Sequence, residues 1–264
     1  MQTNSSPSVA EFAESPDAYT VIPASFRRFI TDRYVLLLGN TPHFTSVQRL
    51  RLASDRIVQA VEEIRGLQTA YGHHSGLWWL GPSTTPNDLE ERLRGLGFIT
   101  PPDRVGLLHA MTCTEEPEPG PPEIVTRRAA SLADLQLATE IRWDAFGTPP
   151  AKRAAERARL PEIWETERGE GIAITFLAFV DGEPAATALG VYAPPGCLLV
   201  GGATVPQARG RGAYRALVRA RWDEAVRRGT PALVVHADPS TSAPILRRLG
   251  FEEVCVLRRL EDPS

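Results

Sequence analysis

Residues 198–228 read LLVGGATVPQARGRGAYRALVRARWDEAVRR, and this stretch decides the fold that we expect of the chain. Its apolar start, Leu198–Val200, predicts a strand. A nearly helical spacing of apolar residues predicts a helix further on, at Leu217, Val218, Trp222, Ala225 and Val226. Between the two lies a glycine- and arginine-rich segment at 207–212. The expected order is therefore strand, loop and helix, with the loop at the N-terminal end of the helix.

This loop has the chemistry of an anion site. The first turn of a helix has unpaired backbone N–H groups and the positive end of the helix dipole. Gly210 and Gly212 have no side chain that would keep an anion away from these groups. Arg209 and Arg211 add charges that no physiological pH removes. We therefore expect bound phosphate here, although neither G-x-x-x-x-G-K-[ST] nor G-x-G-x-x-G is present. A solvated basic loop is the alternative.

Two motifs in this part of the chain resemble motifs of the GCN5-related N-acetyltransferase (GNAT) family. The first is Gln207-x-x-Gly210-x-Gly212, after a strand that ends in Ala-Thr-Val-Pro at 203–206. The second is SAPILRRLGF at 242–251, which resembles the closing helix of the family and its R-L-G-F turn. Together, in this order and spacing, they favour the family over a glycine-rich turn in some other α/β domain.

Composition narrows the function classes. The net charge of −3 gives no overall attraction for nucleic acid. Cys113, Cys197 and Cys255 suggest neither a disulfide framework nor a zinc site, so we expect a reducing, cytoplasmic compartment and no metal. The longest apolar run, Ile172–Val180, is too short to span a bilayer, and the N-terminal stretch does not have the pattern of a signal peptide.

The resemblance implies an α/β (α+β) fold, with a mixed twisted sheet flanked by helices. We expect four parts: a disordered tail over 1–18, a partial, degenerate GNAT-like domain over 19–114, a linker over 115–122 and a GNAT acyltransferase domain over 123–264. The linker reads EEPEPGPP, and proline and the acidic residues should keep it extended and solvated.

The hydrophobic pattern predicts the elements within these parts. In the N-terminal part it predicts a short helix at 26–31, strands at 34–38, 77–80 and 105–111, and helices at about 47–66 and from Pro86. In the C-terminal part it predicts the order β-α-α-β-β-β-α-β-α-β. Ser131 should cap the first of these helices, and Asp181-Gly182 should turn a hairpin.

The N-terminal part also looks like a reduced copy of the C-terminal one. YVLLLGNTP at 34–42 parallels LLVGGATVP at 198–206, and LRGLGF at 93–98 parallels LRRLGF at 246–251. The position of the glycine-rich loop is taken by residues 43–48, HFTSVQ, which include no glycine. We therefore expect that this half does not bind coenzyme A, and that it packs on the catalytic half or shapes the acceptor pocket. Chance similarity of two β-α-β units is the alternative.

The resemblance also implies ligands and residues. The cofactor would be acetyl-CoA, as co-substrate, and the acceptor a primary amine, for which a small molecule is the expected class. Thr204 and Val205 would contact the pantetheine arm, and the Val205 N–H would donate to the oxyanion. Pyrophosphate contacts would come, mostly through backbone N–H groups, from Gln207, Ala208, Arg209, Gly210, Arg211, Gly212 and Ala213.

The acid and base of the reaction are less well defined. Leu246 stands where the family often has a tyrosine as general acid, which puts that role in doubt. His236, at the end of a predicted strand, is the candidate base, and a hydrogen-bonded strand-end histidine is its alternative. Three other functions stay open: a non-catalytic acyl-CoA sensor, an acetyltransferase for protein lysines or N-termini, and an antibiotic- or toxin-binding protein without coenzyme A. We expect no nucleic-acid or membrane partner.

Overall fold

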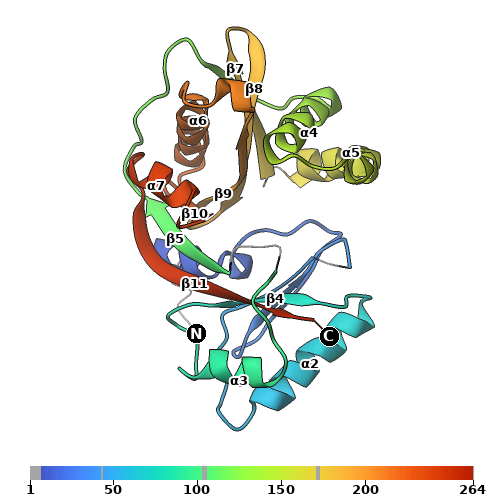
Figure 1. Cartoon of the computed structure of the whole chain (residues 1–264). Coiled ribbons are helices and arrows are strands. Elements are labelled where there is room, and N and C mark those ends of the chain that lie inside the picture. Colours follow the sequence, from blue (N-terminus) through green and yellow to red (C-terminus); the bar gives the residue numbers. More distant parts are fainter. Residues whose placement is uncertain (1–6, 43, 103–105, 171–172, 264) are drawn as a thin grey trace. The chain divides into compact units, whose positions relative to one another are not determined.

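The computed structural model describes residues 7–42, 44–102, 106–170 and 173–263 (Figure 1). These residues form two compact units. Unit 1 comprises 112–235 and 247–251, with 7–9, and unit 2 comprises 10–111, 236–246 and 252–263. This division differs from the expected domains at 19–114 and 123–264. The reason is strand pairing, because the strand over 252–262 pairs with one at 76–80.

Unit 1 contains a mixed sheet with helices on both faces, as expected. Its strands, in the order β6-β7-β8-β9-β10, are β6 (Val125–Arg128), β7 (Ala173–Val180), β8 (Glu183–Ala193), β9 (Gly196–Thr204) and the start of β10 (Leu233–Ala237). β6 to β9 pair antiparallel, and β10 pairs parallel to β9. α6 (Ala213–Arg227) covers one face, and α4 (Leu132–Phe146) with α5 (Pro150–Glu170) lies on the other (Figure 1).

Local signals in unit 1 produce the expected turns and caps. The hairpin between β7 and β8 turns at Asp181 and Gly182, whose φ angles of 55° and 82° are both left-handed. α4 begins after Ser131, whose side-chain oxygen accepts the Asp134 N–H at 3.2 Å. Both predictions are confirmed.

Unit 2 contains a run of neighbouring, hydrogen-bonded strands. Its strands, in the order β1-β2-β3-β4-β11-β5, are β1 (Arg27–Ile30), β2 (Val35–Leu38), β3 (Thr45–Gln48), β4 (Gly76–Leu80), β11 (Glu252–Asp262) and β5 (Leu107–Cys113). β3 and β4 run parallel, whereas β4 and β11 run antiparallel. The helices of this part of the chain are α1 (Val9–Glu14), α2 (Ile57–Ala70), α3 (Leu89–Gly95) and α7 (Ser242–Arg247).

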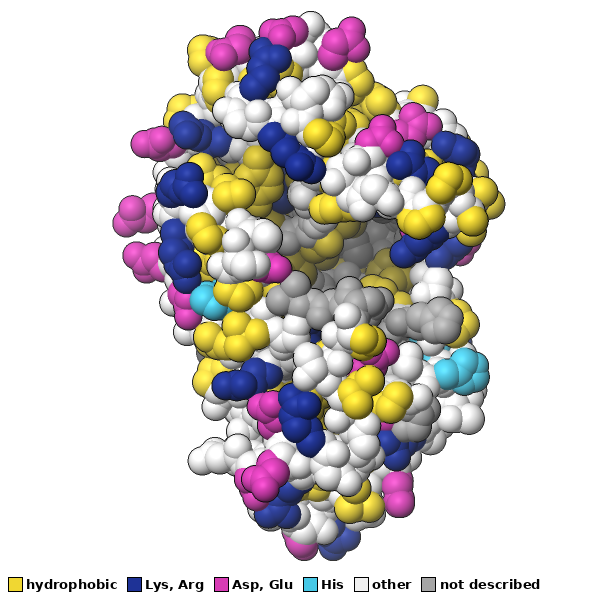
Figure 2. Space-filling view, viewed as in Figure 1, with side chains coloured by type: hydrophobic (Ala, Val, Ile, Leu, Met, Phe, Trp, Pro, Cys, Tyr) yellow, Lys and Arg dark blue, Asp and Glu magenta, His cyan; other side chains and the backbone are white. Residues whose placement is uncertain are grey.

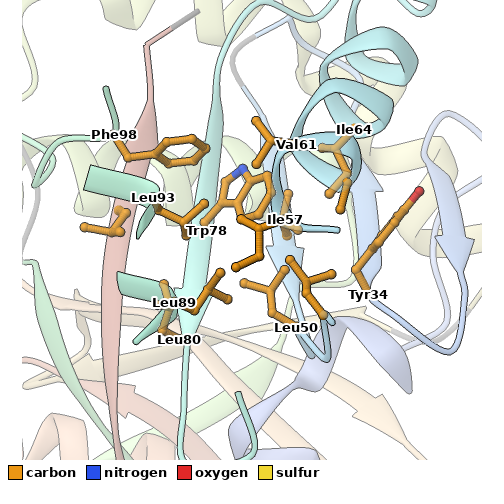
Figure 3. Packing of buried hydrophobic residues seen from close by; sticks show 14 of the residues in the cluster. Tyr34, Leu50, Ile57, Val61, Ile64, Trp78, Leu80, Leu89, Leu93 and Phe98 are labelled. Atoms are coloured by element: carbon orange, nitrogen blue, oxygen red, sulfur yellow. The ribbon is translucent and has the colours of Figure 1, made fainter. Parts of the chain in front are cut away.

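One face of this sheet packs on α2 and α3 (Figure 3). Trp78 of β4 is fully buried, and its ring meets the edge of Phe98 at a centroid distance of 5.0 Å. Ile57 and Val61 from α2 and Leu93 from α3 close around it. This cluster also includes Leu260 of β11, so the core of unit 2 needs a strand from the far end of the sequence.

Three expectations for the N-terminal part are wrong. Residues 27–30 form strand β1 instead of a helix, because pairing with β2 satisfies their backbone. The helix expected at 47–66 begins only at Ile57, after strand β3, and continues through Gly66 to Ala70. The tail expected to be disordered over 1–18 includes helix α1, with Phe12 and Ala13 fully buried. Residues 1–6, 43 and 105 lie outside the described residues.

The surface mixes both signs of charge. On the face shown in Figure 2, lysine and arginine side chains are interspersed with aspartate and glutamate. This agrees with the net charge of −3. Within the described parts of the chain, no helix has the length and apolarity that crossing a membrane would need.

Candidate functional site

The glycine-rich loop connects β9 to α6 in unit 1, as the sequence predicts. β9 ends at Thr204, a 3-10 turn follows at Pro206–Ala208, and Gly212 is the N-cap of α6. Gly210 and Gly212 have φ angles of 77° and 88°. L-residues with a side chain rarely adopt this conformation, so the two glycines give the loop its path.

The loop presents a row of unpaired backbone donors. Among the described residues, no protein acceptor takes the N–H groups from Gly210 to Arg215. The first bonded donor of the helix is Ala216, whose N–H reaches the Gly212 oxygen at 3.0 Å. No side chain caps α6 either. Successive free N–H groups at the positive end of a helix form an anion-binding concavity. Phosphate contacts at 210–213 stay a prediction.

The remaining members of the predicted loop have different surroundings. The Arg209 guanidinium donates to the Ala145 carbonyl at the end of α4, with Nη2 at 3.2 Å, and so ties the loop to that helix. Ala208 and Ala213 are buried and pack in the core of unit 1, whereas Gln207 is exposed. Any contact of these two alanines with a ligand would therefore come from their backbone.

Arg211 has an acidic partner that the sequence analysis did not identify. Its Nη1 lies 2.8 Å from Oδ2 of Asp181, in the turn of the β7–β8 hairpin. This hydrogen bond lowers the pKa of Asp181 below its usual value. Both side chains are exposed, at 46% and 69%, so a phosphate could compete with the carboxylate at small cost. No spacing in the sequence indicates this pair, because it joins two distant turns.

The segment 115–122 packs along α6 through Pro117 and Gly120, whereas its acidic side chains are exposed, as expected. Pro117 is buried, and its carbonyl accepts from the Arg219 guanidinium of α6 at 3.2 Å. A Cβ on Gly120 would lie 2.7 Å from the Ala216 Cα, so only glycine permits this approach. Glu118 lies 3.6 Å from Arg215 of α6, but its side chain is 84% exposed, so this pair adds little and the close packing of Gly120 holds the segment on the helix.

β9 has a free edge next to this loop. Its parallel pairing with β10 covers only Cys197–Leu199, opposite Leu233–Val235. Its pairing with β8 is irregular between Thr187 and Leu189, which marks a bulge in β9, where Gly201 and Gly202 lie opposite one residue of β8. Thr204 still pairs with Ala186 of β8, and it lies at the end of the stretch that has no partner on the β10 side among the described residues.

Val205 does not fit its expected role as oxyanion donor. Its N–H donates to the Ala185 carbonyl at 2.9 Å, so this group is not free for a ligand. The residue itself is buried in the core of unit 1. We correct the expectation for this N–H: it stabilises the junction between β8 and the loop.

His236, the candidate base, and Leu246, at the position of the family's tyrosine acid, both belong to unit 2. His236 Nε2 lies 2.8 Å from the Ala13 carbonyl, and its ring is 5.3 Å from that of Trp79. Burial lowers the pKa of His236 to about 4, so the imidazole is neutral near pH 7. Leu246 is fully buried in α7. These surroundings favour a hydrogen-bonded, structural histidine over a strong base.

No protein-family model and no curated protein matches the sequence. Solved structures, however, match it over nearly its full length. A GCN5-related N-acetyltransferase from Kribbella flavida has a TM-score of 0.72 and 18% identity, and the match covers 98% of this chain and 97% of that one. The chain has the GNAT fold.

Two further structures share the fold at similar extent. A tandem GNAT protein from the clavulanic acid biosynthesis pathway has a TM-score of 0.60 at 13% identity, and the match covers 97% of this chain and 88% of that one. A GCN5-related N-acetyltransferase from Sphaerobacter thermophilus has a TM-score of 0.58 at 20% identity, covering 89% and 81%. The described residues include no cluster of three or more His, Cys, Asp or Glu side chains arranged to hold a metal.

Proposed function

We propose that unit 1 binds acetyl-CoA and transfers its acetyl group to a primary amine of a small molecule. The observation that carries the proposal is the row of six consecutive free N–H groups from Gly210 to Arg215 at the start of α6. These donors fit the pyrophosphate of coenzyme A, and each charge-assisted bond contributes about 1.5–3 kcal/mol. The GNAT fold around the loop supports acetyl transfer as the reaction.

The remaining parts of the loop support the same ligand. The unpaired edge of β9 that ends at Thr204 offers backbone groups for the amide-bearing pantetheine arm. Arg211 can leave its exposed partner Asp181 for a phosphate, because an exposed pair is weak. Thiolate is a tolerable leaving group, since a thiol has a pKa of about 8.5. Transfer therefore needs no tyrosine at the place of Leu246.

Calorimetry with acetyl-CoA tests the donor site. Gly210→Asp places a carboxylate among the free N–H groups, and no atom lies within 4 Å of the new Cβ. We expect this variant to fold and to lose acetyl-CoA binding. Gly229→Asp is the matched control, because Gly229 follows the other end of α6, has a φ of 75° and is equally uncrowded. Equal binding by wild type and Gly210→Asp would contradict the proposal.

Release of free coenzyme A thiol in the presence of candidate amines tests turnover. Small amines should support release, and lysine peptides should not. Preferential acetylation of a peptide would favour the protein acetyltransferase alternative. Tight binding without turnover on any amine would leave the non-catalytic sensor.

The base role of His236 is tested by His236→Gln, which keeps an N–H donor for the Ala13 carbonyl. A base role requires kcat/KM to fall in this variant and the acidic limb of its pH profile to change. An unchanged profile assigns His236 to structure alone.

A further inference from the structure

One buried arginine of unit 1 has no carboxylate partner among the described residues. Arg221 of α6 is only 1% exposed, and its Nη2 has no hydrogen-bond partner there either. The buried acid of the same helix, Glu224, binds three other arginines instead, at positions 128, 227 and 228. Burying a guanidinium without an opposite charge costs stability, and an apolar side chain of similar size is often neutral or stabilising at such a position. A gain in stability therefore does not explain this arginine.

The donors of Arg221 reach the place where β9 leaves β10. Its Nη1 lies 3.4 Å from the Leu189 carbonyl oxygen of β8, and its Nε donates to the Leu217 carbonyl of α6 at 3.0 Å. Leu189 pairs with Val200, and the bulge of β9 begins directly after this pair. Val200 also follows Leu199, the last residue of β9 that pairs with β10. The guanidinium therefore holds β8 at the point where the paired edge of β9 becomes a free edge.

A second side chain of α6 contacts the bulge itself. Tyr214 stands seven residues before Arg221, which is about two turns, so both lie on the same face of the helix. A Cβ on Gly202 would lie 2.7 Å from Cε2 of Tyr214, so the ring packs directly on this glycine. Its neighbour Gly201 has a left-handed φ of 59°. The Arg221 Cζ is 6.0 Å from the centre of the tyrosine ring, so one face of α6 contacts the bulge and the strand pair beside it.

We infer that Arg221 and Tyr214 are positioning residues for acetyl transfer: they hold the bulge of β9 and so keep its free edge in place for the pantetheine arm. The inference rests on the proposed function, in which this edge offers backbone groups to the arm. Neither side chain has to touch the ligand in this role. A buried polar atom without a partner calls for an explanation, and groups kept at a cost in stability are expected at functional sites.

Two ligands separate positioning from charge and from folding. Acetyl-CoA includes the pantetheine arm, whereas 3′-phospho-ADP is the nucleotide part of coenzyme A with its pyrophosphate and without the arm. Arg221→Met keeps an unbranched side chain and removes the charge and the donors. By calorimetry this variant should bind acetyl-CoA about tenfold more weakly and 3′-phospho-ADP as tightly as the wild type does. Urea unfolding should show unchanged or increased stability.

A control and a second variant complete the comparison. Arg227→Met is the matched control, because Arg227 lies on the same helix and its side chain is 57% exposed; both ligands should bind to it as to the wild type. Tyr214→Leu removes the ring from Gly202 and keeps the backbone N–H, so it should also weaken acetyl-CoA selectively. Equal weakening of both ligands in Arg221→Met, unchanged binding of both, or a loss of stability would overturn the inference.

Failure of the proposed function would give a different result, since the wild type would then bind neither ligand. The backbone amide resonances of Gly201 and Gly202 in ¹⁵N-labelled, ligand-free protein test the inference in that case too. They should shift in Arg221→Met and stay in place in Arg227→Met. Unchanged resonances of both glycines in Arg221→Met would overturn the inference, whether or not acetyl-CoA binds.

Discussion

Substituting the two loop glycines by alanine should have different costs, although both glycines look alike in the sequence. Gly210 and Gly212 both have left-handed φ angles, of 77° and 88°. An L-residue in this conformation costs about 1–2 kcal/mol. Nothing lies within 4 Å of a Cβ at Gly210, but one at Gly212 would be 2.5 Å from Pro121 Cγ and 2.6 Å from its Cδ.

This crowding adds a second cost at Gly212 only. Overpacking a closed site costs about 1–3 kcal/mol, because the proline ring cannot rotate away. We therefore expect Gly210→Ala to reduce the free energy of unfolding by about 1–2 kcal/mol and Gly212→Ala by about 2–5 kcal/mol. Urea unfolding followed by tryptophan fluorescence measures both, since Trp222 is buried in α6 of the same unit.

A double-mutant cycle isolates the clash. Pro121→Ala removes the ring, so the combined Gly212→Ala, Pro121→Ala protein should be more stable than the sum of the single changes by about 1–3 kcal/mol. Gly212→Asp is a poor test of ligand binding, because the same clash with Pro121 perturbs the fold. Equal destabilisation at both glycines, or no coupling with Pro121, would refute the packing of segment 115–122 on the helix start.

Three further perturbations test other parts of the structure. Asp181→Asn removes the competitor of phosphate for Arg211, so acetyl-CoA should bind a few-fold more tightly by calorimetry; weaker binding would contradict this. Arg65→Ala removes the two 2.8 Å hydrogen bonds from this guanidinium to the fully buried Asp262. It should lower the free energy of unfolding in urea by about 2–4 kcal/mol, a value reduced for the partial exposure of the arginine, and no loss of stability would show that the pair contributes nothing. The hydrogen bond from Arg127 lowers the pKa of Asp134 to about 2, so the stability that this carboxylate gives the fold is complete above about pH 4 and disappears as the pH falls toward 2. In Asp134→Asn the free energy of unfolding should therefore depend less on pH in this window, and an unchanged pH dependence would contradict the prediction.

The sequence predicts unit 1 well because its signals are local. The strand, loop and helix at the candidate site need no long-range information. An apolar run predicts the strand, two glycines that can adopt left-handed φ angles predict the loop, and an amphipathic pattern predicts the helix. The hairpin at Asp181-Gly182 and the cap at Ser131 are equally local. The partner of Arg211, however, depends on how two distant turns approach each other, and no spacing encodes that distance.

The sequence predictions are wrong where residues from several elements are buried in one core. Val47 and Leu50 continue the apolar spacing of α2, but they reach the same core from β3 and from the loop after it. Arg49, which directly follows β3, has a φ of 53°, and a left-handed arginine has no sequence signature. Segment 115–122 looked like a linker because its composition is polar. Gly120, between Pro119 and Pro121, was the one sequence feature that indicated close packing of this segment on another element.

The pairing of β4 with β11 has a consequence for synthesis. The ribosome completes β4 and α2 long before it makes β11, with the whole of 112–235 in between. Unit 2 therefore leaves the exit tunnel with Leu260 missing from its core and with Arg65 still lacking its buried carboxylate. Unit 1, nearly continuous in sequence, can close first, although domains usually mature in the order in which they are translated. The earliest-made half of this protein therefore cannot complete its core until β11 is made, and until then the edge of β4 that pairs with β11 is open to other strands.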